Sequence, residues 1–114
     1  MPVEFVQAWT WGPLSTSGGL QTHYFKVPFS GAPHIVGTAY LAEVSIGGQV
    51  NGTAGVALAS FSHYETLDAQ GAVVEVPVTS ATSIIEVYNC VSITIALDII
   101  DATGMGGWSF YWMD

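Results

Sequence analysis

A histidine and three carboxylates near the ends of apolar segments are the residues in this sequence best able to do chemistry. His63 and Glu65 are two residues apart, so a β-strand would place both side chains on one face. Two ligands are too few for a metal ion, and we interpret them as a polar pair at a strand end or in a loop. Asp98 and Asp101 carry the oxygen ligands that Ca²⁺ prefers, although capping of turns is the simpler role for them. Enzymatic chemistry would require all four side chains to meet in one pocket.

No other group of residues indicates catalysis. The segment 15–19 is rich in Ser and Gly, but it lacks the Lys and the following helix of a phosphate-binding loop. Cys90 has no basic neighbour in the sequence to activate its thiol, so we do not expect a nucleophile there. His23 and His34 flank a strand and a turn, and we expect them to pack or to form hydrogen bonds. We therefore predict a non-enzymatic protein without catalytic residues, metal ligands or cofactors.

The balance of charges narrows the partners that the chain can have. One Lys, Lys26, and no Arg stand against nine acidic residues, which gives a net charge of −8. Nucleic-acid binding needs several cations to contact phosphates, so that function is excluded, and an anionic membrane surface would repel the chain. The first residues lack the basic and apolar regions of a signal peptide, and no apolar run is long enough to span a membrane. We expect a soluble protein made without a signal peptide.

The amino-acid composition indicates burial against other proteins. Hydrophobic residues make up 50% of the chain and charged residues only 9%, far below the usual share in soluble domains. So few charges do not cover a monomer in the usual way. Either uncharged Gly, Ser, Thr, Asn and Gln cover the surface, or part of it is buried against copies of the chain or other proteins, and we expect both. The length of 114 residues fits one domain spanning residues 1–114. One cysteine excludes an internal disulfide.

Alternation of apolar and polar residues with a period of two dominates the sequence, and it is typical of β-strands with one buried face. Between positions 85 and 99, seven of the eight odd-numbered residues are aliphatic. Such a run exceeds the usual strand length, so we predict a bend or bulge near Asn89 and Cys90, or two collinear strands. Pro28 and Pro77 occur in shorter alternating segments. Because Pro donates no ladder hydrogen bond, each of these segments should end there or lie at a sheet edge.

The remaining strand-forming segments are separated by turn signals rich in Gly, Pro, Ser and Asn. They comprise residues 5–11, 35–44, 56–64 and 108–113. In the last of them Trp108, Phe110 and Trp112 should share one face. No amphipathic helical segment of useful length is present. Six to eight short strands with this spacing predict an all-β fold, a single antiparallel β-sandwich.

Aromatic residues are the remaining candidates for a binding surface, because Trp and Tyr stack on sugar rings and anchor protein interfaces. The chain has four Trp and five Tyr. We expect Trp9 to lie in the core or in a subunit interface. Recognition, where it exists, should fall on residues close to loops, and we predict these binding residues: Trp11, His63, Tyr64 and Asp101.

Three segments carry a resemblance to a known family. Residues 5–12 read FVQAWTWG and end in a Trp-Gly pair. Residues 24–36 read YFKVPFSGAPHIV, an apolar strand followed by a Phe, a small turn, a Pro and an aliphatic pair. Residues 107–113 read GWSFYWM, an aromatic closing strand. In this order the segments resemble the C-terminal tip domains of phage tail-fibre proteins, which are similar to the H-type lectins.

The resemblance implies a β-sandwich of about six strands, commonly a homotrimer, that is displayed on a virion and recognises a host surface glycan or protein. Lectins of this type bind sugar with a basic or otherwise polar cluster. Because this chain has no Arg, no sugar-binding residue can be transferred to it. Fibre tips normally follow a shaft, whereas this sequence begins with Met1 and has none. The alternative is therefore a structural capsid or tail decoration protein, a cement protein with no soluble ligand.

Overall fold

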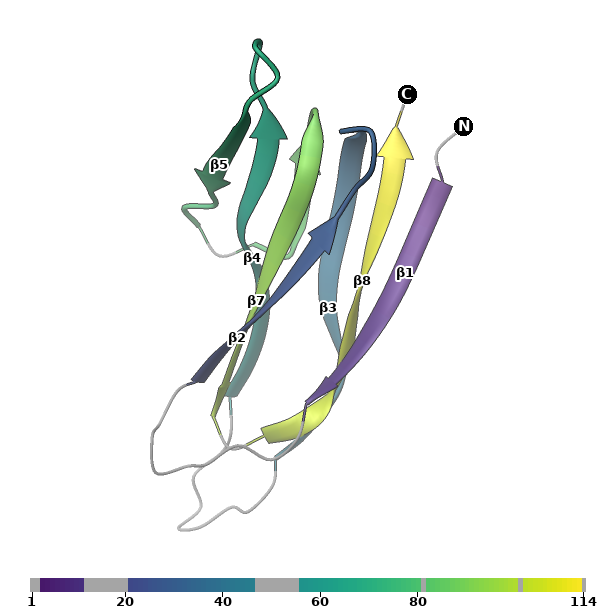
Figure 1. Ribbon diagram of the computed structural model, residues 1–114. Coiled ribbons are helices and arrows are strands. Elements are labelled where there is room, and N and C mark those ends of the chain that lie inside the picture. Colours follow the sequence, from purple (N-terminus) through teal and green to yellow (C-terminus); the bar gives the residue numbers. More distant parts are fainter. Residues whose placement is uncertain (1–2, 12–20, 47–55, 81, 101, 114) are drawn as a thin grey trace.

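Eight β-strands and no helix make up the part of the chain that the computed structural model describes (Figure 1). That part comprises residues 3–11, 21–46, 56–80, 82–100 and 102–113. The strands are β1 (Val3–Trp11), β2 (Gln21–Pro28), β3 (His34–Ile46), β4 (Val56–Leu67), β5 (Val73–Pro77), β6 (Ile84–Val87), β7 (Cys90–Ile100) and β8 (Ala102–Met113). The prediction of an all-β fold with six to eight strands is confirmed.

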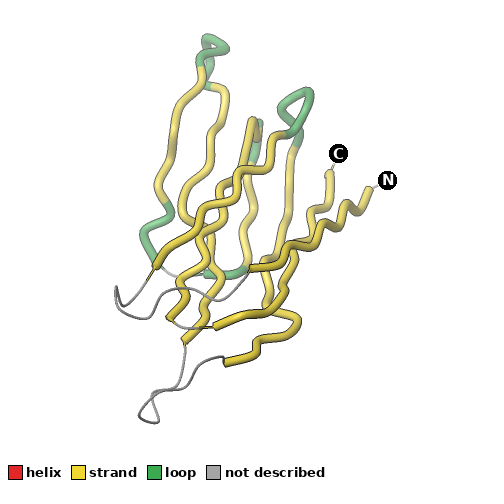
Figure 2. Tube along the Cα trace, turned by 60° about the horizontal axis from the view of Figure 1, so that its bottom comes forward, coloured by secondary structure: helices red, strands yellow, loops and turns green. Residues whose placement is uncertain are grey.

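Two antiparallel four-stranded sheets pack against each other. Sheet A has the strand order β1-β8-β3-β6, and sheet B has the order β2-β7-β4-β5. The chain therefore changes sheet at nearly every connection, which is the topology of a jelly roll, a sandwich of eight strands with two Greek keys. Figure 1 shows β1, β8 and β3 on one side and β2, β7, β4 and β5 on the other, and Figure 2 shows in green the turns that follow β2, β4 and β6 at one end of the sandwich.

The long alternating segment is divided close to Asn89, as predicted. β6 ends at Val87 in sheet A and β7 begins at Cys90 in sheet B, so the bend is a change of sheet. Asn89 has a positive φ of 53°, a left-handed conformation that Asn tolerates better than most residues. Pro28 and Pro77 each end an edge strand, β2 and β5, so both predictions for the prolines are confirmed.

The core lies between the sheets and receives side chains from both. Phe110 of β8 and Phe61 of β4 are buried with their ring centroids 6.5 Å apart. Phe29, just after β2, meets the ring of Phe110 edge-on at 5.1 Å. Fully buried aliphatic side chains from the central strands complete the core: Ile35, Ile93, Ile95 and Leu97. The aromatic residues at even positions of β8 face this core, which confirms the alternation predicted for that strand.

Candidate functional site

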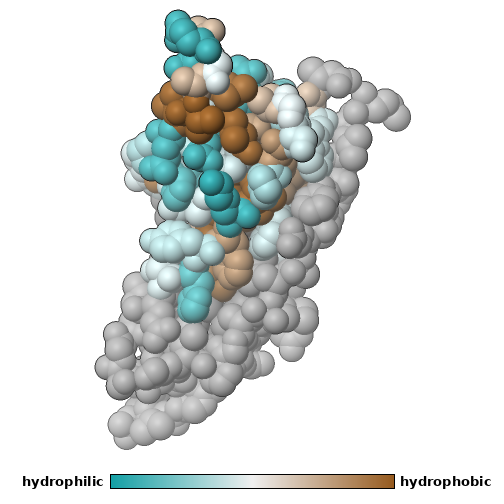
Figure 3. Space-filling view, in the orientation of Figure 1, coloured by the Kyte–Doolittle hydropathy of each residue, from teal (hydrophilic) through white to brown (hydrophobic). Residues whose placement is uncertain are grey.

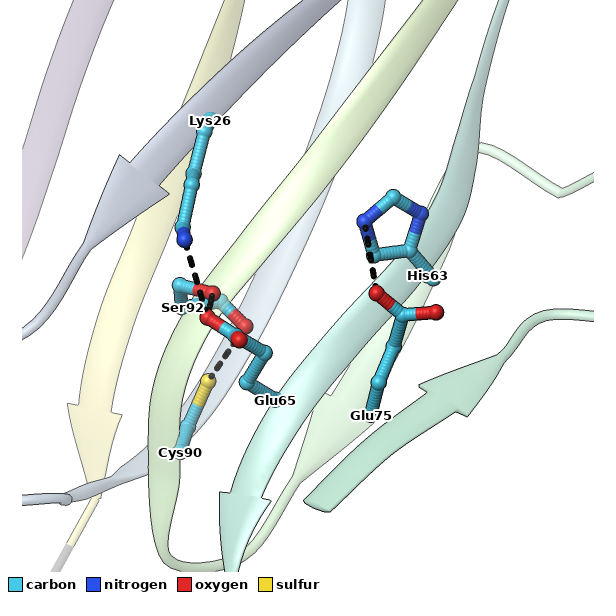
Figure 4. Close-up of polar contacts among 6 residues, drawn as sticks. All are labelled: Lys26, His63, Glu65, Glu75, Cys90 and Ser92. Atoms are coloured by element: carbon cyan, nitrogen blue, oxygen red, sulfur yellow. Dashed lines mark hydrogen bonds and ion pairs between the residues drawn. The ribbon is translucent and has the colours of Figure 1, made fainter. Parts of the chain in front are cut away.

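Polar side chains gather on the outward face of sheet B, the side turned away from the core. Strand pairing places Lys26 of β2 opposite Thr94 of β7, and Thr94 opposite His63 of β4. The next row across the sheet contains Ser92 of β7 opposite Glu65 of β4. Sheet B thus brings together polar groups from strands that are far apart in the sequence (Figure 4).

Glu65 is the centre of a group of polar contacts on this face. The Ser92 hydroxyl donates a hydrogen bond of 2.7 Å to Glu65 Oε1, and Lys26 Nζ lies 3.1 Å from the same oxygen (Figure 4). Ser92 is only 1% exposed, so the packing around it fixes the position of its hydroxyl. The hydrogen bond from Ser92, followed by the contact with Lys26, lowers the pKa of Glu65 below its usual value of 4.5. Glu65 is therefore ionised and held in place at neutral pH.

His63 lies on the same face and contacts a different carboxylate. Its Nε2 is 3.7 Å from Glu75 Oε1 on β5 (Figure 4). Its Nδ1 is 3.0 Å from the hydroxyl oxygen of Ser62. The register of β4 on β7 confirms that His63 and Glu65 share one face of the strand. They do not form a pair of ligands, because the imidazole contacts β5 whereas Glu65 contacts β2 and β7.

Tyr24 adds an aromatic ring to this surface. It precedes Lys26 by two residues on β2, so both side chains point outward, and it is 63% exposed. The residues opposite it on the next two strands, Ala96 and Ser60, are small. We use the name sheet B face for this set of outward residues: Tyr24, Lys26, Ser60, His63, Glu65, Glu75, Ser92 and Thr94. In Figure 3, hydrophilic residues lie on this part of the molecule below a hydrophobic cluster near β5.

Of the residues predicted to bind, the structure places His63 on the sheet B face. Tyr64 follows it in β4 and points to the other side of the sheet, where its ring packs against the core. Trp11 ends β1, a strand of sheet A, and its side chain lies outside the described part of the chain. Asp101 lies outside the described residues, as does the side chain of Asp98. The structure thus separates His63 from Tyr64.

Sequence reasoning missed several residues of the sheet B face. Tyr24 and Lys26 occupy the polar positions of the alternating segment 23–29, so their common face was readable from the sequence. Glu75 and Ser92 reach the face only through the pairing of β4 with β5 and β7. Because strand order depends on contacts far apart in the chain, no local pattern indicated their approach.

Cys90 does not contribute a reactive group. The alternation of residues 85–99 places Cys90 among the more polar, even-numbered positions. In the structure its side chain is fully buried at the start of β7, the strand that follows the change of sheet. Burial raises the pKa of the thiol to about 12, and Sγ donates a weak hydrogen bond of 3.5 Å to the carbonyl of Ser92. The thiol is therefore protonated and unreactive at neutral pH.

Within the described ranges, no three His, Cys, Asp or Glu side chains gather closely enough to hold a metal ion. The same ranges contain no helix that is long and apolar enough to cross a membrane.

The hydrogen bond between Ser92 and Glu65 predicts a pH-dependent stability. Because the pKa of Glu65 is lower in the folded chain than its usual 4.5, the ionised carboxylate favours folding above pH 4.5. This contribution is lost as the pH falls through the lowered pKa. Urea unfolding midpoints of the wild type and Glu65→Gln should therefore differ at neutral pH and converge in acid. In a Ser92→Ala background the pH dependence should shrink, and a difference that is constant with pH would contradict the assignment.

Comparisons of the chain with protein-family models, curated proteins and solved structures find no match. Since one fold supports many functions, the function has to be argued from the residues of the sheet B face and their geometry.

Proposed function

We propose that this protein is a non-enzymatic, oligomeric adhesion module of a virion, of the tail-fibre-tip or lectin-like type, that recognises a host surface glycan or protein. The observation that carries the proposal is the exposed ring of Tyr24 on the same outward face of sheet B as the hydrogen-bonded Glu65 and His63. Tyr rings offer an apolar surface on which a sugar ring stacks, and neighbouring polar groups hydrogen-bond its hydroxyls. A homotrimer would present three such faces, which raises the avidity for a repeated surface ligand.

The polar groups of the sheet B face are positioned before a ligand arrives. Glu65 is fixed by Ser92 and Lys26, and His63 is held between Ser62 and Glu75. All of these except the Ser62 contact join two different strands of a hydrogen-bonded sheet, which positions side chains more rigidly than a loop does. Preorganised groups lose little conformational entropy on binding, so even a shallow surface retains useful affinity.

The charge of the sheet B face favours a neutral glycan. Its Lys26 is paired with Glu65, and Glu75 adds a second carboxylate. The whole chain carries a net charge of −8, so an acidic sugar would be repelled both locally and at a distance. Neutral hexoses and hexosamines, whose hydroxyls bind carboxylates and imidazoles, fit this face better.

A glycan array probed with the purified protein tests the proposal. Tyr24→Ala should lower the affinity for the bound glycan at least tenfold, which corresponds to about 1.4 kcal/mol. Tyr88→Ala is a matched control, because Tyr88 has the same exposed fraction of 63% but lies outside the sheet B face. Equal losses in both variants would contradict a role for the face. A folded oligomer that binds neither glycans nor host cells would contradict adhesion altogether.

A second candidate function is structural decoration of a capsid or tail without a soluble ligand. It is favoured by the exposed apolar side chains on the outward side of sheet A, among them Tyr40, Tyr111 and Met113. Under this function, virions that lack the protein should lose resistance to heat and keep normal attachment to host cells. Under adhesion, virions that lack the protein should instead keep their resistance to heat and lose attachment to host cells.

A further inference from the structure

We propose that the free edge of β5 binds an extended segment of a partner protein, which carries a Lys or Arg between apolar residues and joins sheet B as an additional strand. β5 is the last strand in the order β2-β7-β4-β5, so only β4 pairs with it. Proteins bind extended peptides by adding them to such an edge, where backbone hydrogen bonds supply affinity and alternate side chains supply specificity. This interaction is separate from the proposed recognition of a glycan.

The pairing of β4 with β5 determines which backbone groups of β5 are already bonded. The N–H of Val78, just after β5, donates a hydrogen bond of 2.9 Å to the carbonyl of Ser62 on β4. Hydrogen-bonded pairs recur at every second residue of an antiparallel ladder, and the register of β4 on β5 has no shift. Val76 and Val74 therefore direct their backbone groups to β4.

The residues between them, Val73, Glu75 and Pro77, direct their backbone groups to the free edge. Pro77 has no N–H, so its position there removes no hydrogen bond from sheet B. The N–H groups of Val73 and Glu75 and the carbonyls of all three residues remain for another strand. Within the described part of the chain, no hydrogen bond occupies them.

Apolar side chains flank this edge on both faces of the sheet. Val73 is 55% exposed and Val74 is 41% exposed, and adjacent residues of a strand point to opposite sides. Figure 3 shows hydrophobic residues gathered near β5. An added strand with alternating apolar residues would cover both side chains, so apolar area would be buried on each face.

The edge strands β6 and β2 are protected against such pairing. The Thr82 hydroxyl donates to the carbonyl of Ile84 at 2.9 Å and accepts from the N–H of Ile84 at 3.2 Å, so it occupies backbone groups of β6. β2 carries Lys26, and a Lys on an edge strand discourages pairing with other chains. β5 reads VVEVP and has neither form of protection.

The charge at the edge of β5 favours a basic segment as the occupant. Glu75 lies opposite Glu65, so two carboxylates lie side by side on the outward face. Glu65 is paired with Lys26, whereas the Glu75 side chain is 66% exposed and lies 3.7 Å from His63. A Lys or Arg opposite Glu75 in the added strand would compensate this charge. The net charge of −8 also attracts basic partners from a distance.

A second copy of this chain fits the edge poorly. In the antiparallel register that matches the free groups, Glu75 would lie opposite Glu75 of the second copy, and like charges directly opposite each other destabilise a strand pair. Pro77 would also leave the carbonyl of Val73 without a donor. Lys26 is the one Lys of the chain and lies on β2, so it cannot lie opposite Glu75 when two β5 strands pair. The occupant is therefore a segment of another protein.

An NMR titration of the full chain with the synthetic peptide Thr-Thr-Val-Lys-Val-Thr-Thr, blocked at both ends, tests the proposal. The amide protons of Val73 and Glu75 should move downfield and exchange more slowly with solvent, because they gain acceptors. Those of Val74 and Val76 should change less, since they are already bonded to β4. Equal changes at all four amides, or no change at any of them, would overturn the proposal.

Peptide variants identify the groups that bind. A peptide with Glu in place of Lys should bind more weakly by roughly tenfold, because its carboxylate would meet Glu75. A peptide methylated on the Lys amide nitrogen should also bind more weakly by roughly tenfold, because it cannot donate to the edge of β5. Equal affinities of all three peptides would contradict strand addition.

Two substitutions in the protein separate binding at this edge from general attraction to an acidic chain. Glu75→Lys should weaken binding of the Lys peptide by roughly tenfold, whereas Glu86→Lys should not. Glu86 is a matched control, because its side chain is 53% exposed and it lies on the edge strand β6. The same loss in both variants would mean that net charge alone attracts the peptide, and would overturn the proposal. Glycan binding is measured on the array, so a failed peptide titration would reject only the site on β5.

Discussion

Replacing Phe110 with alanine is expected to lower the free energy of unfolding by about 3–5 kcal/mol. The ring is fully buried and contacts Phe29 and Phe61, so it joins the two sheets of the sandwich. Alanine would leave a cavity between the sheets, and a close-packed core relaxes only partly around such a cavity. Small domains are stable by about 5–15 kcal/mol in all, so this loss is a large share of the total.

Urea unfolding of the wild type and Phe110→Ala measures the effect of removing this ring. The control is Ser109→Ala, the neighbouring residue on β8, whose side chain points outward. That change should alter the free energy of unfolding by less than about 0.5 kcal/mol, as is usual for surface substitutions. Similar values for the two variants would mean that Phe110 does not hold the sheets together.

Adding a side chain at Gly37 is expected to destabilise the fold by about 1–3 kcal/mol. A Cβ on this residue of β3 would overlap Phe110 Cδ1, and it would lie 2.6 Å from Cε1 of the same ring. It would also approach the carbonyl oxygen of Ser109 at 3.3 Å. Because the core encloses the ring of Phe110, the ring has no free space into which to move. Gly37→Ala should therefore lose stability, although Gly is otherwise an unfavourable residue inside a strand.

A double-mutant cycle with Phe110→Leu isolates this overlap. Leucine removes the ring that the new Cβ would meet, so Gly37→Ala should cost less in the Phe110→Leu background than alone. The free energies of unfolding would then be non-additive, as expected for residues in contact. Additive values would show that the cost arises from the backbone of Gly37 and not from the ring.

The fold was largely predictable because its signals are local. Alternation of apolar and polar residues located the strands, and the inward face of β8 followed from Trp108, Phe110 and Trp112. Pro28 and Pro77 marked edge strands because a missing N–H donor is tolerated there. The strand order was not predictable, since it depends on pairings such as β1 with β8 that join distant parts of the chain.

The candidate site was predicted only in part, for the same reason. His63 was identified from its type and its spacing to Glu65, and it does lie on the outward face of sheet B. Tyr64 was predicted beside it, but adjacent residues of a strand point to opposite sides, and its ring packs against the core. The contacts of Glu65 with Lys26 and Ser92 required the pairing of three strands, which no sequence pattern revealed.

The position of β8 between β1 and β3 sets a condition on how the nascent chain folds. β1 is made first, yet the strand that it pairs with in sheet A is synthesised about ninety residues later, and ribosomes add about 5–20 residues per second. Sheet A therefore cannot be completed while residues 102–113 are still inside the ribosome, although β3 can already pair with β6. Until then β1 and β3 present unpaired edges that attract other chains, so we expect a slow folder that benefits from chaperones during translation.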